Sequence, residues 1–438
     1  MALHNRILIG LVLGALIGVS VNWTLATSTD LSALRQLPAG VEAVIRNGTE
    51  PIGNLWLNAL IMVVIPLVVS TLALGVAGLG SLAKVGRIGG IALLSFLSLT
   101  AMAATLGLVM VNTIRPGTGL DPAIQQGLME TYKSQSEQAM GLAQTGVSID
   151  LLVGIVPRNP VKAMADFNML AIIFFSLMVG VALTRLAPDK ARPLLALLES
   201  IAQVTIAIID MVMRVAPYAV FCLIFSVTAR FGFDLLVSLA SYVLTVIAGL
   251  VLFMVVVYPL ALIFVARRRP REFFQKAWIV IVTAFSTSSS NATLPTTLRV
   301  AEEELNVPNE VAGFVVPLGA TMNMNGTALF EGVTVLFVAQ VFGISLPLDQ
   351  QIVVILMSVV VAVGAAGVPG GSIPLLMMVL GMVGAPMQGI AIVLGVDRIL
   401  DMCRTTVNVT GDLVTATIVN RFAGVKGTTV VELPRASS

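Results

Sequence analysis

Five polar side chains recur at helical spacing in the last long apolar segment of this chain: Asp397, Asp401, Arg404, Asn408 and Asp412. At about 100° per residue they fall within an arc of roughly 80° on one helix face. The guanidinium on this face can clamp a carboxylate through two parallel hydrogen bonds, and Asp401 can hold an ammonium group. Asn408 and Asp412 supply hard oxygen atoms for a small cation. The stripe therefore predicts a polar solute site.

Such a stripe is costly inside a membrane. Ionisable groups in the hydrocarbon region cost at least ~2.5–3.5 kcal/mol each, so they normally face a cavity or a partner. The purely structural alternative is that Asp401 and Arg404 merely pair with each other. Five polar groups on one face exceed what a single pair requires, and we therefore favour a solute site.

A second polar cluster, Asn323–Thr327 (NMNGT), interrupts the preceding apolar segment. Its Asn, Gly and Thr residues suggest local unwinding that frees carbonyl oxygens for a cation, although Gly–Thr pairs in membrane helices are also common packing features. The nearby intramembrane Glu331 favours a site, because such carboxyls mark ion and proton pathways. Glu331 is a candidate proton carrier, and the alternative is a buried carboxyl with a structural role.

A serine run, Ser286–Asn291, lies at the centre of another apolar segment. Hydroxyls and free backbone N–H groups at the N-terminus of a half-helix suit a carboxylate. A serine run is weak evidence by itself. Nucleophilic catalysis would need a base beside these serines, and the sequence places none there. We therefore predict that the protein is not an enzyme.

The composition places these polar residues in a bilayer. Hydrophobic residues make up 57% of the 438 residues, charged residues make up 11%, and mean hydropathy is +0.98, whereas soluble domains contain about 25% charged residues. A net charge of +2 offers no field that would attract nucleic acid. Cys222, Cys403 and the lone His4 argue against disulfides, zinc sites and a resident cofactor. The predicted partners are a small solute and lipid.

Uncharged runs of roughly the 20 residues that a spanning helix needs recur along the chain. They cover 7–34, 51–83, 88–114, 167–184, 215–229, 235–266, 277–298, 311–330 and 350–396. Two of them, 277–298 and 350–396, are broken by Ser, Thr, Asn, Gly and Pro, so each predicts two half-helices joined at a tip. Each precedes an apolar helix that we predict to be unbroken, over 311–343 and 389–422. This order predicts an inverted repeat whose site lies where the discontinuous segments meet.

Basic residues fall in alternate connections between the runs, at Arg6, Lys84–Arg87, Arg185–Arg192 and Arg267–Arg271. By the positive-inside rule, the N-terminus and the Arg267–Arg271 cluster face the cytoplasm. Segment 116–147 is polar and is predicted to be an external loop. We expect a multi-pass protein of the plasma membrane with both termini in the cytoplasm.

Four motifs resemble one transporter family: Ser288–Pro295 (SSSNATLP), Asn323–Thr327, Gly367–Ser372 (GVPGGS) and Asp397–Asp412. Over nearly its whole length the chain resembles a bacterial member of the dicarboxylate/amino acid:cation symporter family, also called the glutamate transporter family. The resemblance implies an all-α membrane protein with eight transmembrane helices, two re-entrant helical hairpins and inverted repeats. It also implies a homotrimer of elevator-type transporters, in which a transport domain slides against a scaffold.

The resemblance also divides the chain into domains. The scaffold would comprise helices 1–2 (1–83) and helices 4–5 (148–230), and 116–147 would be the external loop. The transport domain would comprise helix 3 (84–115) and residues 231–438, which contain helix 6, hairpin 1 (about 272–305), helix 7 (about 309–343), hairpin 2 (about 349–386), helix 8 (about 389–422) and a cytoplasmic tail.

The resemblance assigns roles to individual residues. Arg404 would bind the side-chain carboxylate of the substrate, and Asp401 would bind its α-ammonium group. The full substrate set would be Ser288, Ser290, Thr327, Val368, Ser372, Asp401, Arg404, Thr405 and Asn408. A first sodium site would use Asn323, Asn408, Asp412 and the Gly319 carbonyl; a second would use the carbonyls of Thr321, Ala362, Val363 and Ala365, with the Met324 sulfur nearby.

The sequence departs from the family pattern at a third sodium site. Asn325 stands where the family's NMDGT motif has Asp, and Phe96, Leu99 and Thr100 align with a Tyr and a Thr–Ser pair. Because a carboxylate, a phenol and one hydroxyl are missing together, we predict that the third sodium site is lost. Glu331 matches the position at which proton-coupled animal members carry Glu, so H⁺ is a second candidate coupling ion.

Together these observations predict a symporter for aspartate or glutamate that is driven by Na⁺ and/or H⁺. A neutral amino acid would leave Arg404 buried and unpaired, and a C4-dicarboxylate would leave Asp401 facing anions. Both kinds of symporter stay as alternatives, because Asn291 and Ser372 replace a usual Ser and Gly near the pocket. An ion channel is the alternative of another class, since re-entrant segments also build filters.

Overall fold

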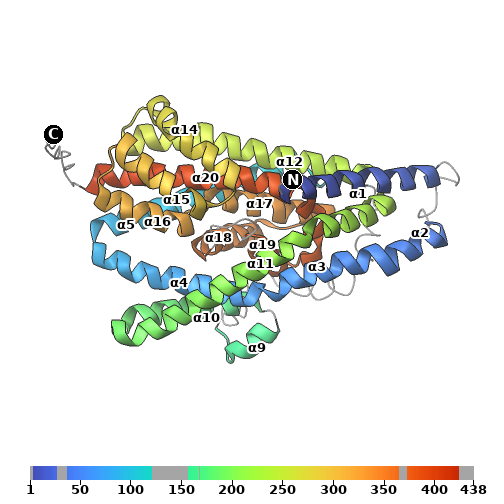
Figure 1. Ribbon diagram of the computed structural model, residues 1–438, viewed down its shortest axis with the longest axis horizontal. Coiled ribbons are helices and arrows are strands. Elements are labelled where there is room, and N and C mark those ends of the chain that lie inside the picture. The colour runs from blue at the N-terminus through green and yellow to red at the C-terminus, as the bar shows by residue number, and fades with distance from the viewer. Residues whose placement is uncertain (1–2, 27–36, 121–155, 167, 365–371, 424–438) are drawn as a thin grey trace, which may run out of the picture.

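The computed structural model describes residues 3–26, 37–120, 156–166, 168–364 and 372–423, and every regular element in these ranges is helical. Figure 1 shows the long helices running along the longest axis of an elongated bundle. Helices are the expected outcome for so apolar a chain, because in lipid each backbone polar group must be satisfied within its own segment.

Six helical segments are long and apolar enough to cross a membrane. They are Asn5–Thr24, Ala39–Gly78, Arg87–Ile114, Pro188–Arg230, Leu235–Ala266 and Asn309–Val341, and two shorter apolar helices cover Ala171–Arg185 and Leu348–Val363. The chain is therefore a multi-pass membrane protein.

The first group of helices is built around two long helices that pack closely. α1 (Leu3–Ala26) lies along α11 (Pro188–Phe231), and Figure 1 shows the two side by side. Glycines permit the approach: a Cβ atom on Gly14 would lie 2.7 Å from the carbonyl oxygen of Phe221. The same part of the chain contains α2 (Ala39–Val44), η1 (Ile45–Thr49), α3 (Glu50–Met62), α4 (Val64–Val85), α9 (Pro160–Ala165) and α10 (Met169–Arg185).

The second group contains the broken helices. It comprises α5 (Arg87–Ile114), α12 (Asp234–Leu252), η2 (Phe253–Val257), α13 (Tyr258–Leu260), η3 (Ala261–Ala266), α14 (Pro270–Thr287), α15 (Ser290–Arg299), η4 (Val300–Glu304), α16 (Asn309–Met322), α17 (Asn325–Val341), α18 (Leu348–Gly364), α19 (Ile373–Met382), η5 (Met387–Ile390) and α20 (Ala391–Ala423). α14 and α15 pack on each other and meet at Ser288–Ser289, where the backbone leaves the helical conformation.

The helix predicted to be unbroken over 311–343 is interrupted, so that prediction is wrong. α16 ends at Met322 and α17 begins at Asn325, because Asn323 and Met324 adopt non-helical backbone angles (φ −110°, ψ 67° and φ −98°, ψ 55°). The local unwinding predicted from the NMNGT motif is confirmed at its first two residues. By contrast, α20 is continuous through the polar stripe, as predicted for 389–422.

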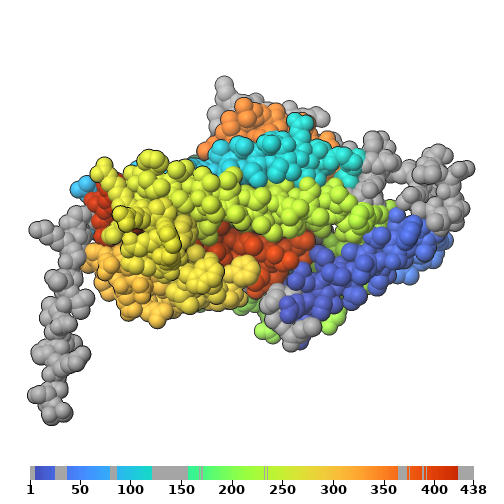
Figure 2. Space-filling view, turned by 90° about the horizontal axis from the view of Figure 1, so that it is seen from above, coloured from blue at the N-terminus to red at the C-terminus, as the bar shows by residue number. Residues whose placement is uncertain are grey.

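α20 occupies the centre of the bundle. It packs against α14, α16, α17, α5 and α12, and also against α1 and α11 of the first group. Figure 1 shows α20 in red running through the middle, and Figure 2 shows it as a narrow strip between α12 and α1. α17, which packs against it, is buried along almost its whole length. The polar stripe of α20 therefore lies inside the protein and not toward lipid.

Candidate functional site

The guanidinium of Arg404 lies at the centre of the buried polar residues. Arg404 is 1% exposed, and its Nη2 donates to Asp401 Oδ1 at 2.9 Å. Its Nη1 lies 3.0 Å from Asp397 Oδ1. The guanidinium carbon stands 3.8 Å from the centre of the Phe330 ring, a cation–π contact from α17. Two carboxylates and one aromatic face thus hold this cation in place.

These contacts leave part of the guanidinium without an acceptor. Among the residues that the structure describes, neither Nε nor Nη1 has a hydrogen bond, because the Asp397 contact has the distance of an ion pair but not the alignment of a hydrogen bond. A buried donor left unsatisfied costs about 1–3 kcal/mol, and more when it is charged. The Asp401–Arg404 pair of the structural alternative does form, but it does not satisfy the guanidinium. An incoming carboxylate would supply the missing acceptor.

The carboxylate of Asp401 contacts a second cation besides Arg404. Its Oδ2 lies 3.6 Å from Arg398 Nη1, one turn nearer the start of the helix, while its Oδ1 accepts from Arg404. The carboxylate is buried, with only a small exposed fraction. Asp397, Arg398, Asp401 and Arg404 together carry no net charge, and they place a cation and a carboxylate side by side, so the cluster can meet a carboxylate and an ammonium group of one ligand.

Asn408 holds the broken helix in position. Its Oδ1 accepts from the backbone N–H groups of Gly326 at 2.7 Å and Thr327 at 3.4 Å, which belong to the first turn of α17. Its Nδ2 donates to Met324 Sδ and to Thr327 Oγ1, both at 3.2 Å. The side chain therefore satisfies orphan N–H groups at the start of α17, as a capping residue does, from a different helix.

Asp412 and Asn323 form an oxygen-rich pair one turn further along α20. Asn323 Nδ2 donates to Asp412 Oδ1 at 2.9 Å, and Asn323 Oδ1 has no hydrogen bond to any residue in the described ranges. A Cβ atom on Gly319 would collide with Asp412 Oδ1, so the α16 backbone comes close to the carboxylate there. Asp412 is 1% exposed and forms no ion pair with a described Lys or Arg. A small cation would suit this carboxylate.

Several predicted hydroxyls are buried, most of them near the breaks between helices and one, Thr405, on α20. Ser288, Ser290, Ser372, Thr327 and Thr405 are all buried. The hydroxyls of Ser288 and Ser372 have no hydrogen bond to the described part of the chain. Ser288 has a left-handed backbone (φ 51°), and α15, which begins two residues later, packs against α20. α15, whose N-terminus would suit an anion, is therefore a direct neighbour of the polar helix.

The second predicted sodium site is only partly described. Thr321 is exposed in the last turn of α16, Ala362 is buried on α18, and Met324 Sδ accepts from Asn408. Two predicted residues, Val368 of the substrate set and Ala365 of this sodium site, lie outside the described residues. Within the described ranges no three His, Cys, Asp or Glu side chains gather, so a cation here would depend on carbonyl and amide oxygens.

A neutral hydrogen-bond chain surrounds Asn325. The Thr100 hydroxyl donates to Asn325 Oδ1 at 2.9 Å, and Asn325 Nδ2 donates to Tyr258 Oη at 3.0 Å. The Tyr258 hydroxyl in turn donates to the carbonyl oxygen of Val407 at 2.8 Å. Tyr258 was not expected at this site, because its only signal in the sequence is a tyrosine in a long apolar span. Each member donates to the next, so this region is filled by protein–protein bonds.

Glu331 is fully buried on α17, two turns after the break. Neither carboxyl oxygen has a hydrogen bond to a described residue. The Ser358 side chain of α18 and the charge of Arg404 both act on the carboxyl. Sequence analysis identified Glu331 but neither Ser358 nor Phe330, since their roles depend on how α17, α18 and α20 pack.

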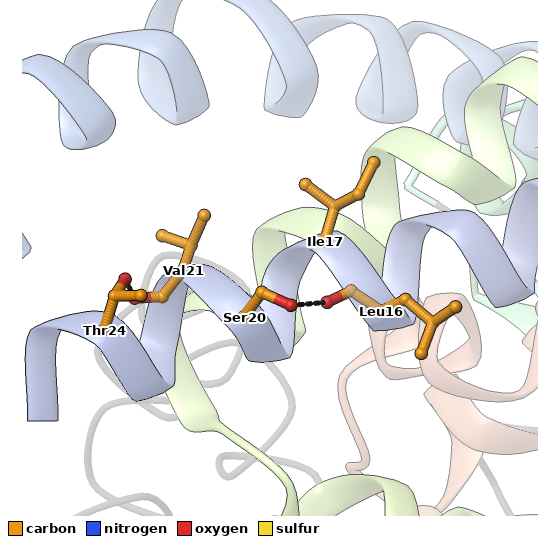
Figure 3. Close-up of a pocket in the computed structure, with 5 residues that line it drawn as sticks. All are labelled: Leu16, Ile17, Ser20, Val21 and Thr24. Atoms are coloured by element: carbon orange, nitrogen blue, oxygen red, sulfur yellow. Dashed lines mark hydrogen bonds between the residues drawn. The ribbon is translucent and has the colours of Figure 1, made fainter.

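A shallow groove on α1 lacks comparable chemistry. Leu16, Ile17, Ser20, Val21 and Thr24 line it. Figure 3 shows the Ser20 hydroxyl turned back onto the carbonyl of Leu16, at 2.7 Å, and Thr24 likewise donates to the carbonyl of Val21 at 3.0 Å. These hydroxyls bond their own helix and leave an apolar surface, which suits an acyl chain better than a polar solute.

Comparison with known proteins identifies relatives along the whole chain. The sequence pattern of the Sodium:dicarboxylate symporter family matches residues 3–422. The Proton/sodium-glutamate symport protein of Bacillus subtilis (strain 168) is 34% identical over 432 residues, which cover 96% of this chain and 93% of that protein. The Proton/glutamate-aspartate symporter of Escherichia coli (strain K12) is 35% identical over 389 residues, 86% of each chain.

A relative named for a different substrate class is about as similar. The C4-dicarboxylate transport protein of Bacillus subtilis (strain 168) is 33% identical over 396 residues, 87% of this chain and 90% of that protein. The family match covers the helices of both groups, including the broken helices and the α20 stripe. The chain therefore belongs to the sodium:dicarboxylate symporter family.

Proposed function

We propose that this protein is a symporter that moves an acidic amino acid, aspartate or glutamate, across the plasma membrane with Na⁺ and/or H⁺. The observation that carries the proposal is the Arg404 guanidinium, which is buried beside Asp401 and retains N–H groups without an acceptor. A carboxylate of the substrate satisfies these donors, and Asp401 receives the α-ammonium group. The names of the relatives from Bacillus subtilis and Escherichia coli support the same substrate class.

Two charges distinguish this substrate from its competitors. A neutral amino acid leaves the guanidinium N–H groups Nε and Nη1 without an acceptor, and a buried donor left unsatisfied costs about 1–3 kcal/mol, and more when it is charged. A C4-dicarboxylate offers a carboxylate to the N–H groups of Arg404 but brings no ammonium group to Asp401. The C4-dicarboxylate relative makes this second class the alternative worth testing. We place the remaining polar contacts at Ser288, Ser290 and Thr405 in the proposed pocket, with Ser372, Thr327, Asn408 and Val368 around them.

The architecture that we propose separates the two groups of helices. The first group, with α1 and α11, serves as the scaffold (1–83 and 148–230), and the second group, with α5 and residues 231–438, moves as the transport domain. α14–α15 and α18–α19 are the two re-entrant hairpins among eight transmembrane helices, and three copies form the trimer, with both termini in the cytoplasm. Gly395 of α20 supports a sliding interface, because a Cβ there would collide with Leu11 of α1.

We propose the two sodium sites that the family resemblance implies, and the oxygen-rich surroundings of the helix break support the first of them. The first uses Asp412, Asn323, Asn408 and the Gly319 carbonyl, and the second uses carbonyls of Thr321, Ala362, Val363 and Ala365 beside Met324. The neutral chain through Thr100, Asn325 and Tyr258 supports the loss of a third site, because its donors and acceptors already bond one another. We therefore expect fewer than three sodium ions per substrate molecule.

A competition panel tests the proposed substrate. Purified protein in proteoliposomes takes up radiolabelled aspartate while unlabelled glutamate, aspartate, serine or succinate is added, with sodium and pH gradients imposed separately. We expect aspartate and glutamate to compete at least ~10-fold more strongly than serine or succinate, because only they fill both charged groups. If serine or succinate competes better than both acidic amino acids, the charge argument is wrong.

The proton part of the proposal predicts a specific loss in Glu331→Gln. In the wild type, we expect a pH gradient that is alkaline inside to drive accumulation of aspartate without a sodium gradient. Glutamine cannot exchange a proton, so the variant should lose this pH-driven uptake while it keeps sodium-driven exchange. The measurement compares the two gradients in the same proteoliposomes. If wild-type uptake does not depend on pH, and ion coupling is unchanged in Glu331→Gln, then protons are not coupled to transport through Glu331.

A further inference from the structure

Ser358 on α18 lies level with Glu331 on the neighbouring helix. α17 ends at Val341 and α18 begins at Leu348, so a short connection makes the two helices antiparallel neighbours, and they pack on each other. Glu331 lies ten residues before the end of α17, and Ser358 lies ten residues after the start of α18. At 1.5 Å per residue, both lie about 15 Å from the connection.

The Ser358 hydroxyl is free to serve this carboxyl. Buried helical hydroxyls in this chain commonly donate to the carbonyl four residues earlier, as those of Ser176 and Thr410 do at 2.7 Å. Ser358 does not: its hydroxyl is fully buried and has no hydrogen bond to a described residue. Its side chain lies within interaction range of the Glu331 carboxyl, whose two oxygens are equally unpartnered. A donor and an acceptor that lie at the same level of two packed helices in an apolar interior gain a hydrogen bond when a side-chain rotation brings them together.

We propose that Ser358 is the positioning residue for the proton on Glu331. When Glu331 is protonated, its O–H donates to Ser358 Oγ; when it is ionised, the Ser358 hydroxyl donates to the carboxylate. The proton enters from water and returns to water, and no other group changes its covalent state. This inference rests on the proton part of the proposed function and adds a residue from a different helix to the proton site.

The other groups around Glu331 cannot take this role. From α20, Arg404 acts on the carboxyl through its charge, but its guanidinium is ion-paired with Asp397 and Asp401, and the proposed function assigns its remaining donors to the substrate carboxylate. From α12, the Tyr242 hydroxyl is paired with Thr334 at 2.8 Å. Arg87 and Asp349 lie in the first turns of α5 and α18 and are the ionisable residues of those helices, and α19 contains no ionisable residue. Among the described residues, Ser358 is the unpaired hydroxyl whose side chain acts on the Glu331 carboxyl.

Infrared difference spectroscopy of the full-length protein in liposomes tests the bond directly. The C=O stretch of a protonated carboxyl is assigned to Glu331 by its loss in Glu331→Gln. In Ser358→Ala we expect this band to move to higher frequency, because the carboxyl loses a hydrogen bond. The pH at which the band appears should also move upward by roughly half to one pH unit, since a hydroxyl stabilises the carboxylate more than the neutral acid.

Two further variants separate this role from packing. Ser358→Thr keeps the hydroxyl and should keep the band and its pH midpoint near the wild type. Thr415→Val removes another buried hydroxyl that lacks a described partner, and it should leave the Glu331 band unchanged. An unchanged band in Ser358→Ala overturns the inference. The inference also fails if Glu331→Gln removes no band from the wild-type spectrum, because Glu331 then shows no protonated form.

Uptake assays in the same liposomes keep this inference distinct from the proposed function. If the wild type takes up no acidic amino acid, the proposed function fails, while the infrared band still decides the Ser358 bond. If the wild type shows pH-driven uptake and Ser358→Ala shifts its pH midpoint upward with the band, the inference is supported. If pH-driven uptake is normal and Ser358→Ala shifts neither readout, the inference fails while the proposed function stands.

Discussion

Replacing Arg404 with glutamine is expected to lower aspartate and glutamate uptake at least ~100-fold, because it removes both the charge and the donors that would bind the substrate carboxylate. Arg404→Lys should retain the charge but not the planar fork, and we expect a loss of roughly 10-fold. Uptake of radiolabelled aspartate by proteoliposomes measures both effects. Binding of serine should weaken much less, because serine has no side-chain carboxylate to lose.

The control for this prediction must separate binding from folding. Arg404→Gln leaves Asp397 and Asp401 without their cation, and breaking a buried pair can destabilise a protein by about 3–5 kcal/mol. The double variant Arg404→Gln with Asp397→Asn removes one of the stranded charges and should raise the melting temperature without restoring uptake. Arg214→Gln, on an exposed position of α11, should leave uptake unchanged. Near-normal uptake by well-folded Arg404→Gln would contradict the assignment.

The chemistry of the α20 stripe could be predicted from the sequence because it depends on one helix alone. Spacing of three and four residues fixes which side chains share a face, so Asp397, Asp401 and Arg404 were expected on one face, and the structure places them in contact. The Asn, Gly and Thr residues of Asn323–Thr327 likewise indicated local unwinding, although the helix predicted to be unbroken across this motif is interrupted. Composition was enough to indicate a membrane protein, and the all-helical class followed from the family resemblance.

Contacts between helices could not be predicted in this way. The Phe330 face against Arg404, the chain from Asn325 to Tyr258, and Ser358 beside Glu331 each join segments whose relative rotation is set by tertiary packing. Asn408 illustrates the limit: the sequence indicated an oxygen ligand, but the structure uses both ends of its amide to cap α17. A polar side chain such as an amide can either bind a ligand or cap a helix terminus, and which of the two it does depends on the residues that pack around it.

Replacing Asp412 with asparagine is expected to raise the sodium concentration for half-maximal uptake at least ~10-fold, because a hydrogen-bonded or coordinated charge is worth roughly 1.5–3 kcal/mol. The variant keeps the size of the side chain but removes the anion that we place at the first sodium site, beside Asn323 and Gly319. Sodium titration of aspartate uptake measures the shift. Asp349→Asn, which removes an exposed carboxylate from the first turn of α18, should leave the titration unchanged.

The same proteoliposomes give the ion count that decides whether Asp412 acts in a reduced set of sodium sites. The membrane potential and sodium gradient at which net aspartate flux reverses should correspond to fewer than three sodium ions in the wild type, because Asn325 stands in a neutral, mutually bonded chain. A count of three would mean that this chain opens to admit a cation. If Asp412→Asn leaves both the titration and the reversal point unchanged, the coupling cation binds elsewhere, and the buried carboxylate serves only to hold Asn323 and the break between α16 and α17.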